Sequence, residues 1–172
     1  MHAYQEIIQK LGLLPHPEGG YYRKQWLSST EVIMADEDLH AVKGNRRIGS
    51  SILYLLASHE ISSWHKLDSD EMWHFYKGSS LILHLIDSQT GLQEKLLGVD
   101  LDAGESPQIL IPKGTWFCTE VSAEDSYSLC GCCLWPAFSY ADFKLASPDE
   151  MQKLYPNHID LIQRLKNKQN KL

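Results

Sequence analysis

The sequence has no long apolar run and no cluster of basic residues outside its last few positions. No stretch approaches the roughly 20 apolar residues that cross a bilayer, and the opening MHAYQEIIQK lacks the apolar core of a signal peptide. The net charge is −6, whereas a nucleic-acid-binding domain usually carries a basic face. We therefore expect a cytoplasmic protein that binds neither a membrane nor a nucleic-acid polymer.

Cysteine is scarce, and its spacing does not suit a structural metal. The chain has four cysteines, and three of them lie in the CGCC stretch at 130–133. A zinc site usually needs a second, distant Cys pair, which this sequence lacks. In a strand, Cys130 and Cys132 share one face and Cys133 points to the other. We expect reduced cysteines that act as small apolar strand residues.

A phosphate-binding glycine loop is also missing. The stretch LLPHPEGG (13–20) is rich in proline and glycine but lacks the glycine spacing and the lysine of such a loop. Its His16 and Glu18 lie beside a turn, as in a structured surface loop.

The residues that carry the most chemistry are concentrated in SSWHKLDSDEMWHFYKG, residues 62–78. The turn formers at 68–70 separate two alternating segments, which predicts a hairpin. In the first strand Ser63 and His65 share a face. One face of the second strand carries Glu71, Trp73 and Phe75. The hairpin would bring His65 and Glu71 together on one side.

Short strands separated by turns account for most of the chain. A helix is expected over 3–11, ended by Gly12. Strands are expected over 21–29, 48–58, 61–67, 71–76 and 80–92, as two strands in 99–117 broken at 104–107, and as two strands in 127–145 bent at Trp135-Pro136. This succession has no βαβ alternation and is typical of a sandwich or a closed barrel.

The C-terminal tail has a different pattern. Ser147, Pro148 and Glu150 are the N-cap, first-turn proline and returning acid of a capping box, so a helix should run to about Leu154. Pro156 should break it and begin a second helix with an apolar stripe of Ile159, Ile162 and Leu165. We expect one domain over 1–172, with a barrel at about 18–146 and a helical tail at 147–172. The polar segment 30–46 would act as a lid or a dimer contact.

Several of these stretches resemble motifs of the cupin superfamily. Glu71 to Gly78 resembles the E-x6-G half of the first cupin motif, with His65 at its second histidine and Ser63 at its first. IPKGTWF (111–117) resembles the second motif, with Phe117 at the histidine position. HPEGGYY (16–22) and YSLCGCCLWPAFSYADFKL (127–145) are similar to one uncharacterised cupin family, long carried as a domain of unknown function.

The resemblance implies an all-β fold, a double-stranded β-helix (cupin jelly-roll barrel) with short N- and C-terminal helices. It also raises the expectation that the loop with His16 and Glu18 borders the pocket. Metal-binding cupins hold their ion with three imidazoles and one carboxylate. Because only His65 and Glu71 remain at those positions, we expect no resident metal, and at most weak divalent binding there. A metal-dependent enzyme with a rearranged ligand set, using His74 or His84, stays open.

Without a metal, His65 beside a carboxylate is a general-base arrangement. The family is distantly similar to jelly-roll deoxysugar epimerases, which use a histidine base and a tyrosine acid. This implies a metal-independent isomerase or epimerase acting on a sugar or nucleotide derivative. The candidate catalytic residues are His65, Glu71 and Tyr76, with Tyr22 and Tyr54 as other candidate acids. The candidate ligand-binding residues are Ser63, Trp73, Phe75, His84, Trp116, Phe117, Tyr22 and Arg23.

Each of these residues also has a structural alternative: core packing for the aromatics, a satisfied interior histidine for His84, and a solvent-facing side chain for Arg23. A non-enzymatic ligand-binding protein therefore remains a second hypothesis. The expected partner in either case is a small polar molecule. A homodimer is also expected, because the N-terminal strand and the C-terminal tail offer apolar stripes that one subunit would leave uncovered.

Overall fold

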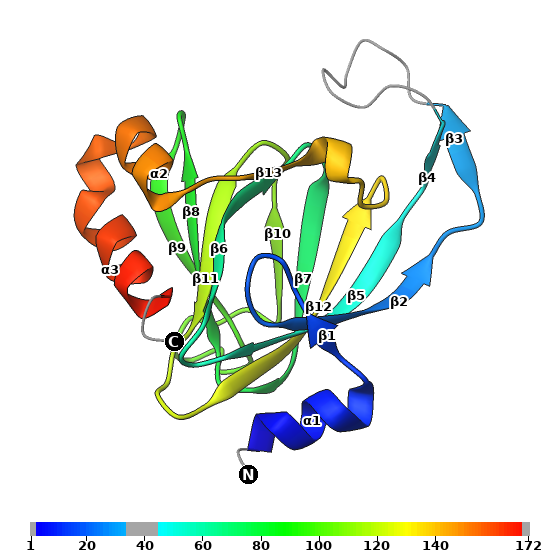
Figure 1. Cartoon of the computed structure of the whole chain (residues 1–172), viewed down its shortest axis with the longest axis horizontal. Coiled ribbons are helices and arrows are strands. Elements are labelled where there is room, and N and C mark those ends of the chain that lie inside the picture. Colours follow the sequence, from blue (N-terminus) through cyan, green and yellow to red (C-terminus); the bar gives the residue numbers. More distant parts are fainter. Residues whose placement is uncertain (1–2, 34–44, 170–172) are drawn as a thin grey trace.

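Two antiparallel sheets lie face to face in the computed structural model, which describes residues 3–33 and 45–169 (Figure 1). In spatial order, the six-stranded sheet contains β1 (Leu14–Pro15), β2 (Tyr21–Leu27), β5 (Ser50–Ala57), β12 (Tyr127–Trp135), β7 (Asp70–Gly78) and β10 (Gln108–Ile111). The five-stranded sheet contains β13 (Phe143–Leu145), β6 (Ile61–Leu67), β11 (Trp116–Val121), β8 (Leu81–Asp87) and β9 (Gly91–Leu97).

The main core lies between these two sheets. Strand alternation turns large apolar side chains of both sheets inward, among them Tyr54, Leu56, Trp73, Leu83 and Phe117. Cys130 and Cys132 belong to the same core, and all four cysteines are free. The expected all-β jelly roll is confirmed. It is built as two packed sheets rather than as a closed ring of hydrogen-bonded strands.

The predicted 62–78 hairpin is wrong in one respect. β6 and β7 are consecutive strands, but they belong to different sheets, so the turn between them crosses the sandwich. A bulge also lies in β6, because Phe117 pairs with His65 whereas Thr119 pairs with Ser62. The extra residue makes Ser62, rather than Ser63, share the inner face with His65.

The segment 99–117 also differs from its prediction. Residues 101–104 form a turn, in which the Ala103 N–H donates to Asp100 Oδ1 at 3.1 Å. The following apolar stretch is then split into β10 and β11 by a turn at 112–115, where Gly114 has φ 79°. The turn-forming side chains at both points outweigh the strand-like alternation around them.

The helices match their predictions closely. α1 (Ala3–Leu11) ends at Gly12, whose φ is 59°. α2 (Pro148–Leu154) begins with the expected capping box, and the short 3-10 helix η2 (Pro156–His158) leads into α3 (Ile159–Gln169). A second 3-10 helix, η1 (Tyr140–Asp142), follows β12. No helix among the described residues is both long enough and apolar enough to cross a membrane.

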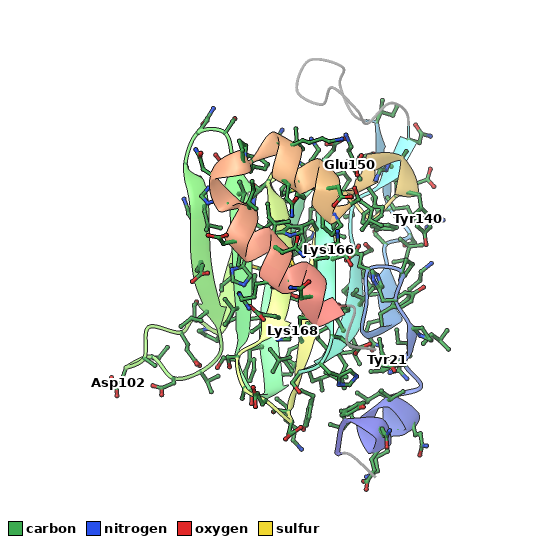
Figure 2. The ribbon with its side chains drawn as sticks, turned by 60° about the vertical axis from the view of Figure 1, so that its left-hand side comes forward. Tyr21, Asp102, Tyr140, Glu150, Lys166 and Lys168 are labelled. Carbon is green, nitrogen blue, oxygen red and sulfur yellow. The ribbon has the colours of Figure 1, made fainter. Side chains whose placement is uncertain are left out.

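Helices α2 and α3 cover the outer face of the five-stranded sheet (Figures 1 and 2). Ile162 and Leu165 are fully buried there, whereas Ile159 is 45% exposed at the start of α3. The C-terminal stripe is therefore largely covered by its own subunit, and the expected homodimer stays a prediction that rests on the N-terminal strand.

β3 (Glu31–Ile33) and β4 (Asn45–Arg47) form a separate ribbon. Most of the predicted lid or dimer contact, residues 34–44, lies outside the described residues.

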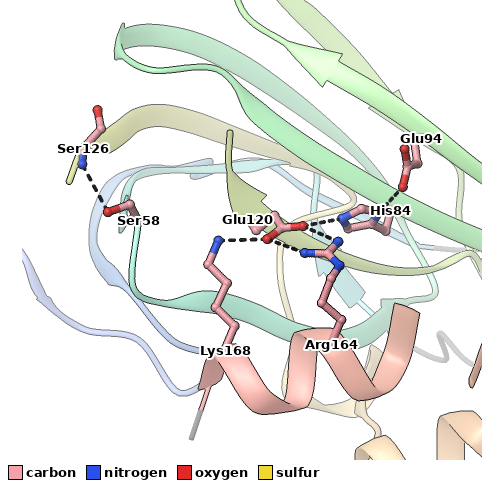
Figure 3. Close-up of polar contacts among 7 residues, drawn as sticks. All are labelled: Ser58, His84, Glu94, Glu120, Ser126, Arg164 and Lys168. Atoms are coloured by element: carbon pink, nitrogen blue, oxygen red, sulfur yellow. Dashed lines mark hydrogen bonds and ion pairs between the residues drawn. The ribbon is translucent and has the colours of Figure 1, made fainter. Parts of the chain in front are cut away.

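A buried carboxylate attaches α3 to the sheet (Figure 3). Glu120 Oε1 accepts hydrogen bonds from His84 Nε2 at 3.0 Å and Arg164 Nη2 at 2.7 Å, and Glu120 Oε2 accepts from Lys168 Nζ at 2.8 Å. On its other side, His84 Nδ1 lies 3.0 Å from Glu94 Oε1. Burial alone would raise the pKa of Glu120, but these hydrogen bonds outweigh it and hold the pKa well below its usual range.

We expect Glu120→Gln to lower the free energy of unfolding by about 2–4 kcal/mol at pH 7, since it leaves the buried His84 imidazole and the Arg164 and Lys168 side chains without their carboxylate. A depressed folded pKa stabilises the fold above the unfolded pKa of about 4.3, and that stabilisation is lost as the pH falls. The difference in the free energy of unfolding between the parent and Glu120→Gln should therefore be smaller at pH 3.5 than at pH 7. Urea unfolding at both pH values measures this, with the exposed Glu124→Gln, which lies outside this network, as the control. Equal stability of Glu120→Gln and parent at pH 7 would contradict the account.

Candidate functional site

A cavity opens between the sheets at the end that carries β2, η1 and the loop before β2. Its volume is about 160 Å³. Because one water needs roughly 10–15 Å³ on this scale, the cavity has room for on the order of ten waters or one small organic molecule. Its polar lining residues include His16, Glu18, Lys24, Tyr54, His65 and Glu71. Its apolar walls include Tyr22, Leu67, Trp73, Leu134, Phe138 and Phe143.

Glu18 reaches the cavity because its loop folds tightly against β6. Gly19 and Gly20 have φ values of 111° and 71°, and a Cβ atom on Gly19 would lie 2.2 Å from the Ile61 carbonyl oxygen. The Ser63 N–H donates to the Glu18 carbonyl at 2.8 Å, and the Tyr54 hydroxyl donates to the Gly19 carbonyl at 2.8 Å. The glycine pair therefore allows a close approach that turns the Glu18 side chain inward.

The central contact of the cavity joins His65 to Glu18. His65 Nδ1 lies 2.7 Å from the Ser63 carbonyl oxygen, which only accepts, so Nδ1 must carry a hydrogen. His65 Nε2 lies 3.2 Å from Glu18 Oε2. Ser62 Oγ donates to the same Glu18 oxygen at 3.2 Å. One proton must therefore be shared between Nε2 and Oε2, and both nitrogens of the imidazole are engaged.

Burial decides which form of this pair is stable at neutral pH. It raises the pKa of Glu18 to about 8, against the opposing effect of the Ser62 hydrogen bond. It also lowers the pKa of His65, although the charge of Glu71 and the Ser63 carbonyl act the other way. The shared proton thus stays on Glu18, and the pair is neutral.

His16 extends this uncharged environment. Its Nδ1 accepts from the Glu18 N–H at 3.3 Å, and its ring meets the rings of Tyr22 and Tyr54 edge to face. The pKa of His16 is lowered to about 4, mainly by burial and to a smaller extent by the nearby His65. Two imidazoles and one carboxyl group of the cavity are therefore neutral at pH 7.

Glu71 lines the same cavity from the other sheet. It lies on β7, only 6% exposed, and its Oε2 has no hydrogen-bond partner among the described residues. Burial raises its pKa to about 7, while the neighbouring His65 and the Trp73 indole partly oppose that shift and Glu18 adds to it. Glu71 therefore exchanges its proton close to neutral pH.

The structure divides the sequence-predicted site residues into three groups. His65, Glu71, Trp73 and Tyr22 line the cavity. Phe117 lies behind it, with its ring centroid 4.0 Å from that of His65, and Phe75 packs on the core. The other predicted residues lie outside the cavity lining. Ser63 lies in the β6 bulge, His84 belongs to the Glu120 network, and Tyr76 is exposed. Trp116 lies beneath the Lys66 and Lys144 ammonium groups, and Arg23 lies on the opposite face of β2 from the lining residues Tyr22 and Lys24.

The residues that sequence reasoning undervalued are Glu18, His16 and Ser62. The first two belong to HPEGGYY, whose resemblance to the cupin family already indicated a loop at the pocket border. Ser62 enters through the β6 bulge, which the alternation of residues 61–67 does not reveal. Tyr54, one of the candidate acids, does line the cavity, but its hydroxyl donates to Gly19.

The residues present do not fit the four-ligand ion site of metal-binding cupins. Two of its positions hold Ser63, in the bulge, and Phe117, which has no donor atom. Within residues 3–33 and 45–169, no three His, Cys, Asp or Glu side chains are grouped to hold an ion. Weak divalent binding at His65 and Glu71 stays a prediction.

A double-sheet jelly roll with a ligand-sized cavity between its sheets is the architecture of cupins. The chain belongs to the family Cupin_5, described as Cupin superfamily (DUF985), which it matches over residues 5–146. The expected family is therefore confirmed.

Two solved structures are similar over nearly their whole length. A Shewanella oneidensis protein is 38% identical, with 96% of this chain and 97% of that chain covered and a TM-score of 0.82. A hypothetical protein from Leishmania major is 30% identical, with 93% and 96% covered and a TM-score of 0.83. Oxalate decarboxylase from Bacillus subtilis is 13% identical, with 88% of this chain and 36% of that chain covered and a TM-score of 0.54, which shows a shared fold alone. No curated protein matches the chain significantly.

Glu71→Gln should make the protein more stable at alkaline pH. A carboxyl group whose folded pKa of about 7 exceeds its ordinary 4.5 destabilises the fold as the pH rises from 4.5 through 7. An amide of the same shape avoids that loss, which is on the order of 3 kcal/mol at pH 8 and small at pH 4.5. Urea unfolding at both pH values measures the effect, with the exposed Glu124→Gln as the control. A variant less stable than its parent at pH 8 would show that Glu71 is held as a paired carboxylate.

Proposed function

We propose that the chain binds a small, uncharged polar molecule in this cavity and catalyses a proton transfer on it, as an isomerase or epimerase does. The observation that carries the proposal is the buried Glu18–His65 pair. A carboxyl group and an imidazole that share one proton, sheltered from water and beside open space, form an acid–base unit.

Glu18 is the member that meets the ligand in this proposal. Its contacts with described side chains all fall on Oε2, so Oε1 is left for a ligand. When Oε1 takes a proton from the substrate, the proton on Oε2 passes to His65 Nε2. The carboxyl group stays neutral throughout, and the positive charge develops on an imidazole whose Nδ1–H already donates to the Ser63 carbonyl. The pair can thus accept a proton without placing a bare carboxylate in a dry cavity.

The lining supports an uncharged, hydroxyl-bearing ligand. Because Glu18, His16 and His65 are neutral at pH 7 and Glu71 is only partly ionised, the interior offers no positive charge to balance an anionic group. Trp73, Tyr22 and Phe143 give flat walls on which a ring such as a sugar can stack. Lys24, exposed at the opening, is the single Lys or Arg among the lining residues that the structure describes. A small sugar or related hydroxy-carbonyl compound satisfies these constraints.

A two-stage experiment tests this function. A metabolite library is first screened by thermal shift, with and without divalent ions, and each binding compound is then incubated in D2O with the protein. We expect at least one neutral binding compound to gain one deuterium, because the proton that returns comes from solvent. Glu18→Gln and His65→Gln should each slow this uptake by about 100-fold or more.

His74→Gln is the matched control, since His74 contacts Gln108 outside the cavity lining. It should exchange at the parental rate. Binding without any deuterium uptake would reduce the function to ligand binding alone, and unchanged uptake in Glu18→Gln would remove the pair from the chemistry.

A further inference from the structure

The cavity contains a second buried carboxyl group that the Glu18–His65 pair does not use. Glu71 belongs to β7 of the six-stranded sheet, whereas His65 belongs to β6 of the five-stranded sheet, and the Glu18 loop is bonded to β6 through Ser63. The two units therefore line one cavity from opposite walls. Each is a carboxyl group less than one-tenth exposed.

The unsatisfied chemistry of Glu71 indicates a ligand-related role. A buried carboxyl oxygen that no protein group pairs is left to be paired by water or by a ligand in the cavity. Glu71 Oε2 is such an atom among the described residues. Its strand neighbour Trp73, also a lining residue, has a buried indole Nε1 that meets full hydrogen-bond geometry with no described group, although the indole acts on Glu71 and lowers its pKa.

We propose that Glu71 is a second catalytic residue, which delivers a proton to the substrate from the face opposite the Glu18–His65 pair. This inference rests on the proposed function and narrows it. Two proton-transfer groups on opposite faces of one carbon invert its configuration, so the reaction is an epimerisation. The substrate class is a neutral hydroxy-aldehyde or hydroxy-ketone, since a C–H bond needs an adjacent carbonyl before groups this weak can ionise it.

The step balances within the residues of the cavity. The C–H bond breaks, its proton goes to Glu18 Oε1, and the Oε2 proton moves to His65 Nε2. The C–H electron pair forms a carbon–carbon double bond while the carbonyl pair moves onto oxygen, which gives an enolate. The Glu71 carboxyl proton then adds to the opposite face of the same carbon, and the carbonyl reforms. The His65 proton then returns to Glu18 Oε2, and the Oε1 proton passes through water to Glu71, which restores the starting state.

Deuterium uptake and inversion, measured together, test this assignment. The parent and Glu71→Gln are each incubated in D2O with erythrose, ribose, xylose, glucose, mannose and fructose, and both epimers are quantified by proton NMR. For at least one sugar, we expect the parent to gain deuterium at the inverted carbon. Glu71→Gln should lose inversion by about 100-fold yet keep exchange that retains configuration, because the pair on the other wall is intact. Glu71→Asp should recover part of the inversion.

The outcomes separate this inference from the proposed function. Inversion by Glu71→Gln at the parental rate overturns the role of Glu71 and leaves the Glu18–His65 chemistry standing. Exchange without inversion in the parent does the same. No uptake by the parent from any of the six sugars overturns both for this substrate class. The surface variant Glu124→Gln should match the parent in both readouts.

Discussion

The contact between Glu18 and His65 imposes requirements on distant parts of the chain. An acid and an imidazole that share one proton in a dry cavity need a loop that enters the sandwich, an acceptor for the second imidazole nitrogen, and walls that exclude water. The Gly19-Gly20 pair provides the first, the Ser63 carbonyl the second, and the aromatic lining the third. Loss of any one would leave a buried polar group unpaired or let water in.

The opposite end of the molecule handles charge in a different way. Glu120 is also buried, yet three cationic or hydrogen-bonding side chains hold it ionised, and it fixes α3 on the five-stranded sheet. Glu18 and Glu71 have no such cations among the described residues around them, so burial raises their pKa values. Carboxyl groups in one fold thus differ with their surroundings: Glu120 is ionised and stabilises a helix contact, whereas Glu18 and Glu71 keep their protons to higher pH at the cavity.

Sequence pattern predicted the helix ends and most strands of the fold correctly. The capping box at Ser147, the stop at Gly12 and the alternation of most strands depend on neighbouring residues, and the structure has them all. The placement of β6 and β7 in different sheets could not be predicted from local pattern, because a short polar turn suits both a hairpin and a crossing between sheets. The bulge that exchanges Ser62 for Ser63 is equally hidden, since it depends on β11, some 50 residues away.

The site was predictable only in part for a related reason. His65 and Glu71 drew attention through their residue types and their resemblance to the first cupin motif. Glu18 lies far from them in the sequence and looked like a loop residue. What brings it to His65 is the close approach that two glycines allow, a property of the assembled fold. Tyr76 illustrates the converse, since a residue close in sequence to Glu71 ends exposed outside the cavity lining.

The protonation state of His65 is the most direct test of this account. Selective 15N labelling of histidine, with His65 assigned by its absence in His65→Gln, reports each ring nitrogen at pH 7. The account predicts a neutral ring with a hydrogen on Nδ1 and none on Nε2. An imidazolium with hydrogens on both nitrogens, or a neutral ring protonated at Nε2, would contradict it.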